Sequence, residues 1–145
     1  MYKNILIATD GSEFARRAID QGLELAKALN AHVTAVKVTE PWVEVLSGEA
    51  VLVHPEEEYQ AEMTTRAAHA LGVVAERAAT LGVHCDTIHV RDQNPAEGIL
   101  AAAKDRGCDL IVMASHGRRG LQRLMFGSQT HRVLTNTTLP VLVCR

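Results

Sequence analysis

Short apolar runs alternate with longer amphipathic stretches along the whole of this 145-residue chain. The runs have the length of strands, whereas the longer stretches repeat their apolar residues at helical spacing. We expect strands over residues 3–9, 32–38, 83–90, 108–114 and 140–144, and helices over 13–30, 56–81, 95–106 and 128–136. This alternation predicts an α/β fold, a sandwich of three layers with a parallel sheet between helices.

Turn and cap residues mark several of the predicted boundaries. The Asp10-Gly11-Ser12 turn ends the first strand and supplies capping side chains for the helix that follows. Gly82 and Gly107 are helix stops, and the third helix begins at Asn94-Pro95-Ala96-Glu97, which resembles a capping box. The inward faces predicted for the first two helices comprise Phe14, Ala15, Ala18, Ile19, Gly22, Leu23, Ala26 and Leu29, and then Ala67, Leu71, Val74, Ala75 and Ala78.

The composition is that of one globular domain, which we expect to span residues 1–145. Apolar residues make up 47% of the chain, charged residues 22%, and the net charge is −2. A slightly acidic chain with few, scattered aromatic residues argues against nucleic acid as a partner. No stretch has the length of a signal peptide or a membrane span, and the three cysteines form no disulfide framework. We therefore expect a cytoplasmic protein that does not bind membranes.

The loop after the fourth strand carries the strongest chemical signal. In an open parallel sheet, ligands bind beyond the carboxyl ends of the strands. Here the loop delivers Gly127-Ser128 to the start of a helix, where the first backbone N–H groups lack partners within the helix and favour an anion. The hydroxyls of Ser128 and Thr130 add donors. Glycines at 117 and 120 let the loop fold back, and a set of basic residues surrounds them: His116, Arg118, Arg119 and Arg123.

Four segments, taken together, resemble the universal stress protein family over the whole chain. They are Ala8-Thr9-Asp10-Gly11-Ser12, Met113-Ala114-Ser115-His116-Gly117, Gly127-Ser128 and Pro140-Val141-Leu142-Val143. ATP-binding members of that family carry the pattern Gly-x2-Gly-x9-Gly-Ser/Thr. In this chain Gly117, Gly127 and Ser128 match the pattern, and Ala114 stands at the position of its first glycine.

The resemblance implies five parallel strands in the order 3-2-1-4-5 and an adenine nucleotide, ATP with or without Mg²⁺, as the ligand. It implies that Asp10 binds the ribose and that Val38 meets the adenine. The backbone near Ala114 and Gly117 would contact ribose and phosphate, and the start of the last helix would hold the terminal phosphates. The candidate nucleotide-binding residues are Ala8, Thr9, Asp10, Val38, Met113, Ala114, His116, Gly117, Arg118, Gly127, Ser128, Gln129 and Thr130.

Alternative functions leave weaker signals. Asp10 with Ser12 also fits a plain helix cap. Alternation along a strand puts Cys85 and His89, but not His84, on one face, and two ligands do not make a zinc site.

We predict a stress-response regulator with little or slow ATP hydrolysis. A nucleotide-independent dimeric scaffold and a slow, autophosphorylating ATPase remain as alternatives. The apolar Val141-Leu142-Val143 strand further predicts a homodimer that pairs these strands across its axis.

Overall fold

The computed structural model describes residues 1–43, 55–116 and 127–145. Five parallel strands form one sheet in the order β3-β2-β1-β4-β5, which confirms the predicted α/β class and strand order. The strands are β1 (Asn4–Ala8), β2 (His32–Val38), β3 (Cys85–Val90), β4 (Leu110–Ala114) and β5 (Val141–Cys144). The helices are α1 (Glu13–Leu29), α2 (Glu56–Leu81), α3 (Pro95–Asp105) and α4 (Ser128–Asn136).

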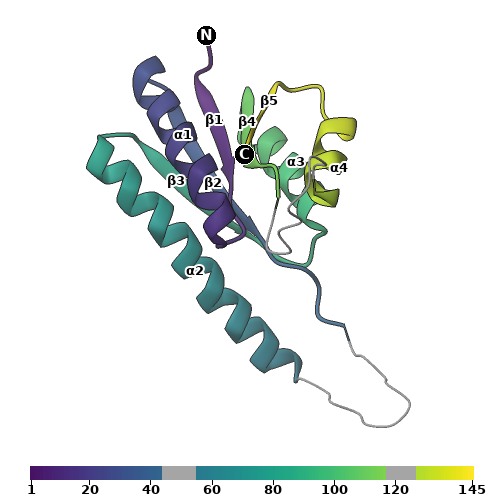
Figure 1. The fold of residues 1–145 in the computed structure, drawn as a ribbon. Helices are drawn as coiled ribbons and strands as arrows, with labels where there is room; N and C mark the ends of the chain where they lie inside the picture. The colour runs from purple at the N-terminus through teal and green to yellow at the C-terminus, as the bar shows by residue number, and fades with distance from the viewer. Residues whose placement is uncertain (44–54, 117–126) are drawn as a thin grey trace.

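Because side chains alternate between the two faces of the sheet, the buried strands contribute to two separate hydrophobic cores. Ile5 and Ile7 of β1 pack with α1 and α2 on one face of the sheet, whereas Leu6 packs with α3 and α4 on the other. All three side chains are fully buried, as expected for a central strand of a parallel sheet. The helices therefore form an outer layer on each side of the sheet (Figure 1).

Two strands begin later than their apolar runs predict, because the helices before them use the first residues as caps. The predicted starts were 83 for β3 and 108 for β4, whereas the observed starts are Cys85 and Leu110. The amide of Val83 donates to the Ala78 carbonyl (2.9 Å), and that of Cys108 donates to the Ala103 carbonyl (2.9 Å). Each bond satisfies a carbonyl in the last turn of the preceding helix, so these residues belong to helix ends.

The inward faces of α1 and α2 are confirmed in their spacing but not at every residue. Phe14, which we expected inside, is 52% exposed, because it lies in the first turn of α1, beyond the end of β1. On α2, Ala70 is buried and Ala75 only half-buried. The three cysteines are free, and two of them, Cys108 and Cys144, are buried in the core.

Candidate functional site

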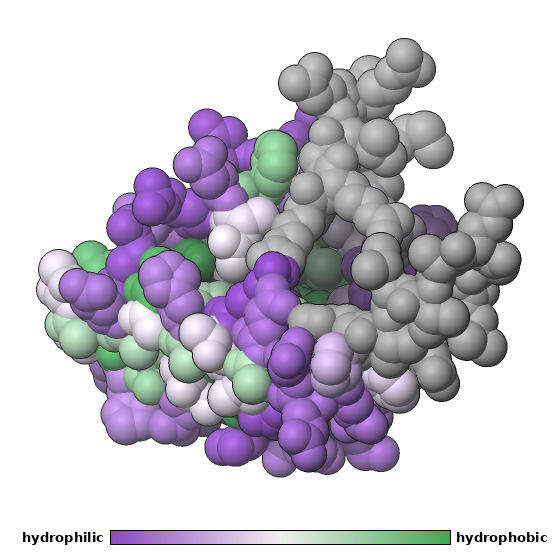
Figure 2. Space-filling model, turned by 90° about the horizontal axis from the view of Figure 1, so that it is seen from below, coloured by the Kyte–Doolittle hydropathy of each residue, from purple (hydrophilic) through white to green (hydrophobic). Residues whose placement is uncertain are grey.

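The carboxyl end of β1 is the point at which the strand order reverses. Ala8, the last residue of β1, pairs with Val36, and β2 continues from there to Val38. On the other side β4 continues to Ala114, two residues past the partner of Ile7. β1 thus ends earlier than both neighbours, at the position where α/β sheets accept ligands. Figure 2 shows the molecule from the side toward which β1 runs, with hydrophobic residues visible between hydrophilic ones.

The turn after β1 is held by its own side chains. Asp10 Oδ1 accepts hydrogen bonds from the Ser12 amide (2.9 Å) and the Ser12 hydroxyl, and Thr9 Oγ1 accepts from the Gly11 amide (3.1 Å). Gly11 adopts a left-handed conformation (φ 81°), which favours glycine there. Ser12 occupies the N-cap position of α1 but makes no side-chain cap bond. The prediction of a capping side chain for this helix was therefore wrong, because the Ser12 hydroxyl donates to Asp10.

One oxygen of Asp10 remains available to a ligand. Its Oδ2 makes no hydrogen bond within the part of the chain that the structure describes, whereas Oδ1 holds the turn. The side chain is half-buried at the end of β1. The Asp10 side chain can thus hold the turn and bind a ligand at once, since one oxygen organises the turn and the other can accept a hydroxyl proton.

The first turn of α4 is fastened to the end of β4. The Gly127 amide donates to the Ser115 carbonyl (2.8 Å). Thr130 is 3% exposed, and its hydroxyl donates toward the carbonyls of Ala114 (3.0 Å) and Ser115 (3.2 Å). Because a hydroxyl carries one proton, Thr130 has none left for a phosphate in this arrangement. Its side chain fixes where the helix begins.

The amides that open α4 are its main anion-binding resource. The first bond of the helix runs from the His131 amide to the Gly127 carbonyl (3.0 Å), and Gly127 provides no side-chain cap. Within the described ranges the N–H groups of Ser128, Gln129 and Thr130 have no acceptor. Ser128 is exposed and adds a hydroxyl. Unpaired amides at a helix N-terminus attract negatively charged oxygens.

The start of α3 is joined to the start of α4, a contact that the sequence did not reveal. The Ala96 amide is shared by Asn94 Oδ1 (3.2 Å) and Gln129 Oε1 (3.1 Å). Asn94 is the N-cap of α3 and Pro95 follows it, so the predicted helix start is confirmed. The Gln129 side chain is therefore directed to α3, and its backbone amide is the group that faces the helix entrance.

Val38 and Thr39 form the wall at the end of β2. Val38 is buried, and a Cβ added at Gly98 of α3 would lie 2.7 Å from both of its methyl carbons. Buried Thr39 places Oγ1 2.8 Å from His89 Nε2. Burial, with the positive charges of Arg91 and Lys37, lowers the pKa of His89, so this imidazole is neutral at neutral pH. No sequence pattern placed Gly98 or His89 at this edge of the sheet, because neither belongs to a motif.

The remaining candidates have different surroundings. The side chains of Ala8 and Met113 are buried in the core beneath α3 and α4, so only their backbone can meet a ligand. His116 lies half-buried with Nδ1 3.1 Å from the Ser115 hydroxyl. The predicted roles of Gly117 and Arg118 fall outside the described residues.

The profile of the universal stress protein family matches residues 1–145. The chain belongs to the universal stress protein family. It is 35% identical over 149 residues to the universal stress protein YxiE of Bacillus subtilis, and the match covers all of both chains. Its fold superposes on the structure of MJ0577 from Methanocaldococcus jannaschii with a TM-score of 0.78 and 31% identity, covering 99% of this chain and 96% of the other.

Two further solved structures of universal stress proteins share the fold and were determined with adenine nucleotides. One, in complex with cAMP, has a TM-score of 0.72 and 23% identity over 99% of this chain and 97% of that one. The other, from Archaeoglobus fulgidus in complex with dAMP, has a TM-score of 0.67 and 20% identity over 99% and 98%. At these identities the likeness establishes the fold of this universal stress protein. None of its described helices is long and apolar enough to cross a bilayer.

Proposed function

We propose that this universal stress protein binds an adenine nucleotide, with ATP as the main ligand, at the carboxyl edge of β1 and β4. The observation that carries the proposal is the start of α4, where the amides of Ser128, Gln129 and Thr130 have no acceptor among the described residues. That helix is fastened to β4, which neighbours β1 and the turn with Asp10. Relatives of the same fold crystallised with cAMP and dAMP support the ligand class.

Each part of the nucleotide has a matching group at this edge. Asp10 Oδ2 accepts a proton from a ribose hydroxyl, and Val38 contacts the adenine ring. The backbone of Thr9, just after β1, and of Ala114, at the end of β4, contacts the ribose, and the Ser128 hydroxyl and the α4 amides hold the terminal phosphates. We expect Gly117, His116 and Arg118 to complete the phosphate site and Mg²⁺ to accompany the phosphates. The Thr130 hydroxyl acts by positioning α4.

The role of the nucleotide is regulatory in this proposal. Phosphoryl transfer needs a placed base and phosphates held by metal. The sequence next to Gly127 contains no acid that would orient a water molecule, so we expect slow hydrolysis or none. A stress-response regulator that changes state with bound nucleotide fits the family and this site. Release of phosphate from ATP at a rate typical of enzymes would favour the autophosphorylating or ATPase alternative.

The first test is a thermal melt of the full chain with and without Mg-ATP. A ligand at about 100 times its dissociation constant adds about 2.7 kcal/mol to the free energy of unfolding. For a domain of this size we expect the melting temperature to rise by roughly 5–10 °C. Parallel melts with cAMP, dAMP and GTP measure the preference for adenine and for the number of phosphates. No shift at millimolar Mg-ATP would refute the proposal.

A matched pair of variants then locates the site. Asp10→Asn removes the acceptor charge at the ribose, and we expect about 1.5–3 kcal/mol weaker binding, the usual worth of a hydrogen bond to a charged group. Asp105→Asn makes the same change at the exposed last residue of α3 and should leave affinity unchanged. Gly127→Val should crowd the phosphates and abolish binding without unfolding the chain. Equal affinity in Asp10→Asn and Asp105→Asn would move the ribose elsewhere.

We also propose a homodimer that pairs β5 strands across a twofold axis. β5 is the edge of the sheet, hydrogen-bonded on one side to β4, and Leu142 is 36% exposed. An apolar edge with unpaired backbone groups is usually covered by another strand. We expect sedimentation to give a dimer for the wild type and a shift to monomer for Leu142→Lys. A monomer at micromolar concentration would refute the pairing.

Finally, we propose that the protein works in the cytoplasm. All three cysteines are free in the structure, and two of them are buried core residues. Free thiols with no disulfide are typical of a reducing compartment. Fractionation of the source cells, with detection of the native chain, tests this placement directly. Recovery of the protein in an extracellular or periplasmic fraction would contradict it.

A further inference from the structure

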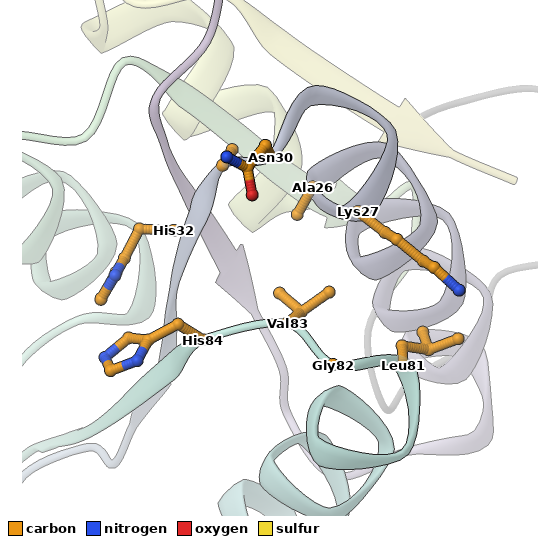
Figure 3. Close-up of a pocket in the computed structure, with 9 residues that line it drawn as sticks. Ala26, Lys27, Asn30, His32, Leu81, Gly82, Val83 and His84 are labelled. Carbon is orange, nitrogen blue, oxygen red and sulfur yellow. The ribbon is translucent and has the colours of Figure 1, made fainter.

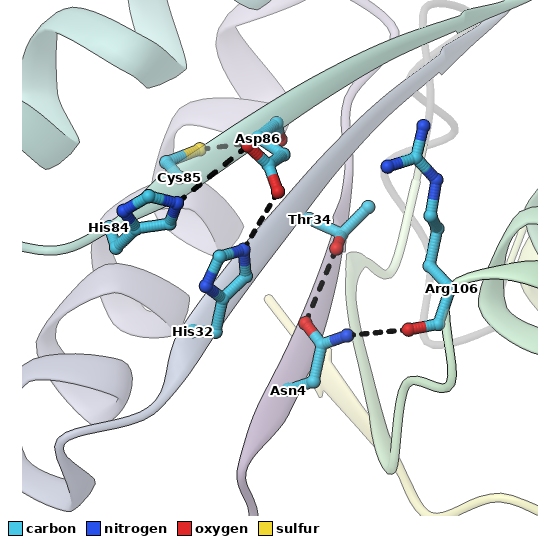
Figure 4. A network of polar contacts seen from close by, with 7 residues as sticks. All are labelled: Asn4, His32, Thr34, His84, Cys85, Asp86 and Arg106. Carbon is cyan, nitrogen blue, oxygen red and sulfur yellow. Dashed lines mark hydrogen bonds and ion pairs between the residues drawn. The ribbon is translucent and has the colours of Figure 1, made fainter.

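A cluster of three metal-ligating side chains lies at the opposite, amino edge of the sheet. His32 is the first residue of β2, and the pairing of Val33 with Cys85 brings it beside His84, just before β3. Asp86 follows on the same side, since successive side chains alternate along the strand. Figure 4 shows both imidazoles directed toward the Asp86 carboxylate. The sequence alone grouped Cys85 with His89 on one face of this strand, because the register between β2 and β3, which brings His32 to Asp86, is not visible in the sequence.

The distances within the cluster suit one shared ion. His32 Nε2 lies 2.9 Å from Asp86 Oδ2, and His84 Nε2 lies 3.7 Å from Asp86 Oδ1. The two rings are 4.2 Å apart between centroids, and all three ligand atoms fall within 4.8 Å of one another. Ligands bound to tetrahedral Zn²⁺ at 2.0–2.1 Å are separated by about 3.4 Å. Small side-chain rotations therefore bring the three ligands to one metal ion.

The chemistry of the cluster selects a class of ion. Two imidazoles and a carboxylate are the ligands of zinc and related transition metals, whereas calcium and magnesium prefer oxygen alone. Asp86 supplies the one carboxylate of the set, beside the two imidazoles. The side chains are 36%, 71% and 51% exposed for His32, His84 and Asp86, which leaves room for entry of an ion and a bound water.

The surroundings also favour a cation. A pocket of about 390 Å³ adjoins the cluster, and His32 and His84 form one of its sides (Figure 3). The C-terminal turns of α1 and α2 line the same pocket, ending at Asn30 and Gly82 in left-handed conformations. Helix C-termini carry partial negative charge, the reverse of the α4 start at the other edge. Lys27 is a positively charged residue in the pocket lining. In Figure 3 its side chain lies on the opposite side of the pocket from the two imidazoles.

We propose that His32, His84 and Asp86 bind one divalent transition-metal ion, Zn²⁺ fitting best, independently of the nucleotide site. The ion replaces the hydrogen bond between His32 and Asp86. The Nε2 lone pair of His32 becomes a ligand, and the ring carries its proton on Nδ1. Three protein ligands leave the fourth tetrahedral position to water, as at open zinc sites.

The test uses the full-length chain without an affinity tag and Zn²⁺ alone at neutral pH. Competition with a chromophoric chelator should give one Zn²⁺ per chain. His84→Gln and Asp86→Asn each remove a ligand, and we expect affinity to fall by more than the roughly 10–100-fold lost with an outer-shell partner. All three residues are substantially exposed, so these variants should melt like the wild type.

Two control variants make the result specific. His69→Gln removes an exposed histidine of α2 that lies outside the cluster, and it should bind Zn²⁺ like the wild type. Cys85→Ser tests the neighbouring thiol, whose loss should change nothing, and Co²⁺ bound to the chain should show no thiolate charge-transfer band. Retained binding in His84→Gln and Asp86→Asn, loss of binding in Cys85→Ser, or no binding by the wild type would overturn the proposal. ATP melts of the same variants keep this outcome separate from the nucleotide site.

Discussion

Replacing Gly98 with alanine tests how tightly α3 packs against the wall of the proposed adenine site. The added Cβ would lie 2.7 Å from both methyl carbons of Val38 and 3.3 Å from its Cβ. Real Cβ contacts are longer than this, so Val38 or α3 must move. Val38 is 8% exposed and β-branched, which leaves it few alternative rotamers. The crowding from the added methyl group therefore falls on Val38, which we expect to contact the adenine ring.

The expected magnitude comes from two opposing effects. Alanine in a helix interior is about 1 kcal/mol more favourable than glycine. Overpacking a well-filled core costs about 1–3 kcal/mol. Gly72→Ala in α2 is the matched control, because Gly72 is exposed and an added Cβ there meets nothing within 4 Å. The control gains the helix-propensity effect alone, so the difference between the variants isolates the packing cost, about 1–3 kcal/mol.

Urea unfolding of both variants measures this difference, with the urea dependence of the free energy expected to stay constant. In thermal melts, Gly98→Ala should unfold roughly 3–9 °C below Gly72→Ala. Adding Val38→Ala to Gly98→Ala removes the crowding methyls, and the double-mutant cycle should show favourable coupling. ATP affinity should fall in Gly98→Ala and stay unchanged in Gly72→Ala. Equal stabilisation of both variants would show that Val38 and α3 are not in tight contact and would refute the reasoning.

Three further predictions concern the core and the titrating groups. Gly22→Ala places a methyl 2.7 Å from the buried Ile7 side chain, so its overpacking should outweigh the helix gain of about 1 kcal/mol and lower the urea midpoint. His89 has a lowered pKa in the fold, so its stability contribution is complete above about pH 6.5 and is lost as pH falls through the folded pKa. Unfolding measured against pH should therefore be less steep for His89→Gln between neutral and weakly acidic pH, and an identical slope would contradict this. Burial raises the pKa of every cysteine thiol, so a disulfide reagent at neutral pH should react slowly with the native chain and rapidly after denaturation. Fast labelling of Cys108 or Cys144 in the native chain would contradict their burial.

Local patterns in the sequence predicted the elements because helices and strands are organised by near neighbours. The Asn94-Pro95 start of α3 and the Gly82 stop of α2 appear in the structure where the sequence placed them. The errors in the extent of the elements lie at their boundaries. Val83 and Cys108 look like strand residues in an apolar run, but their amides complete the preceding helices. A hydrogen bond decided their assignment, and hydrophobicity carries no information about it.

At the proposed nucleotide site, the sequence predicted a region of the fold but not which atoms in it are available to a ligand. The turn residues alone pointed to the start of α4, whereas the ligand role of Asp10 came from the family resemblance. The sequence predicted that the hydroxyls of Thr130 and Ser128 both donate to the ligand. In the structure the Thr130 hydroxyl is buried and donates to the Ala114 and Ser115 carbonyls, whereas Ser128 is exposed. Gly98 carried no signal, since its importance comes from Val38 on a distant strand.

By itself the sequence determined the class of fold, the order of elements along the chain, and the helix start with unpaired amides. These features depend on periodicity and capping within a few residues. Which strands become neighbours depends instead on the packing of whole elements, and here the strand order came from the family resemblance and was then observed. Only the register of β2 against β3 brought His32 to Asp86, 54 positions apart in the chain. Contacts of that kind arise from tertiary packing, because no local interaction encodes which residues will face each other across a sheet.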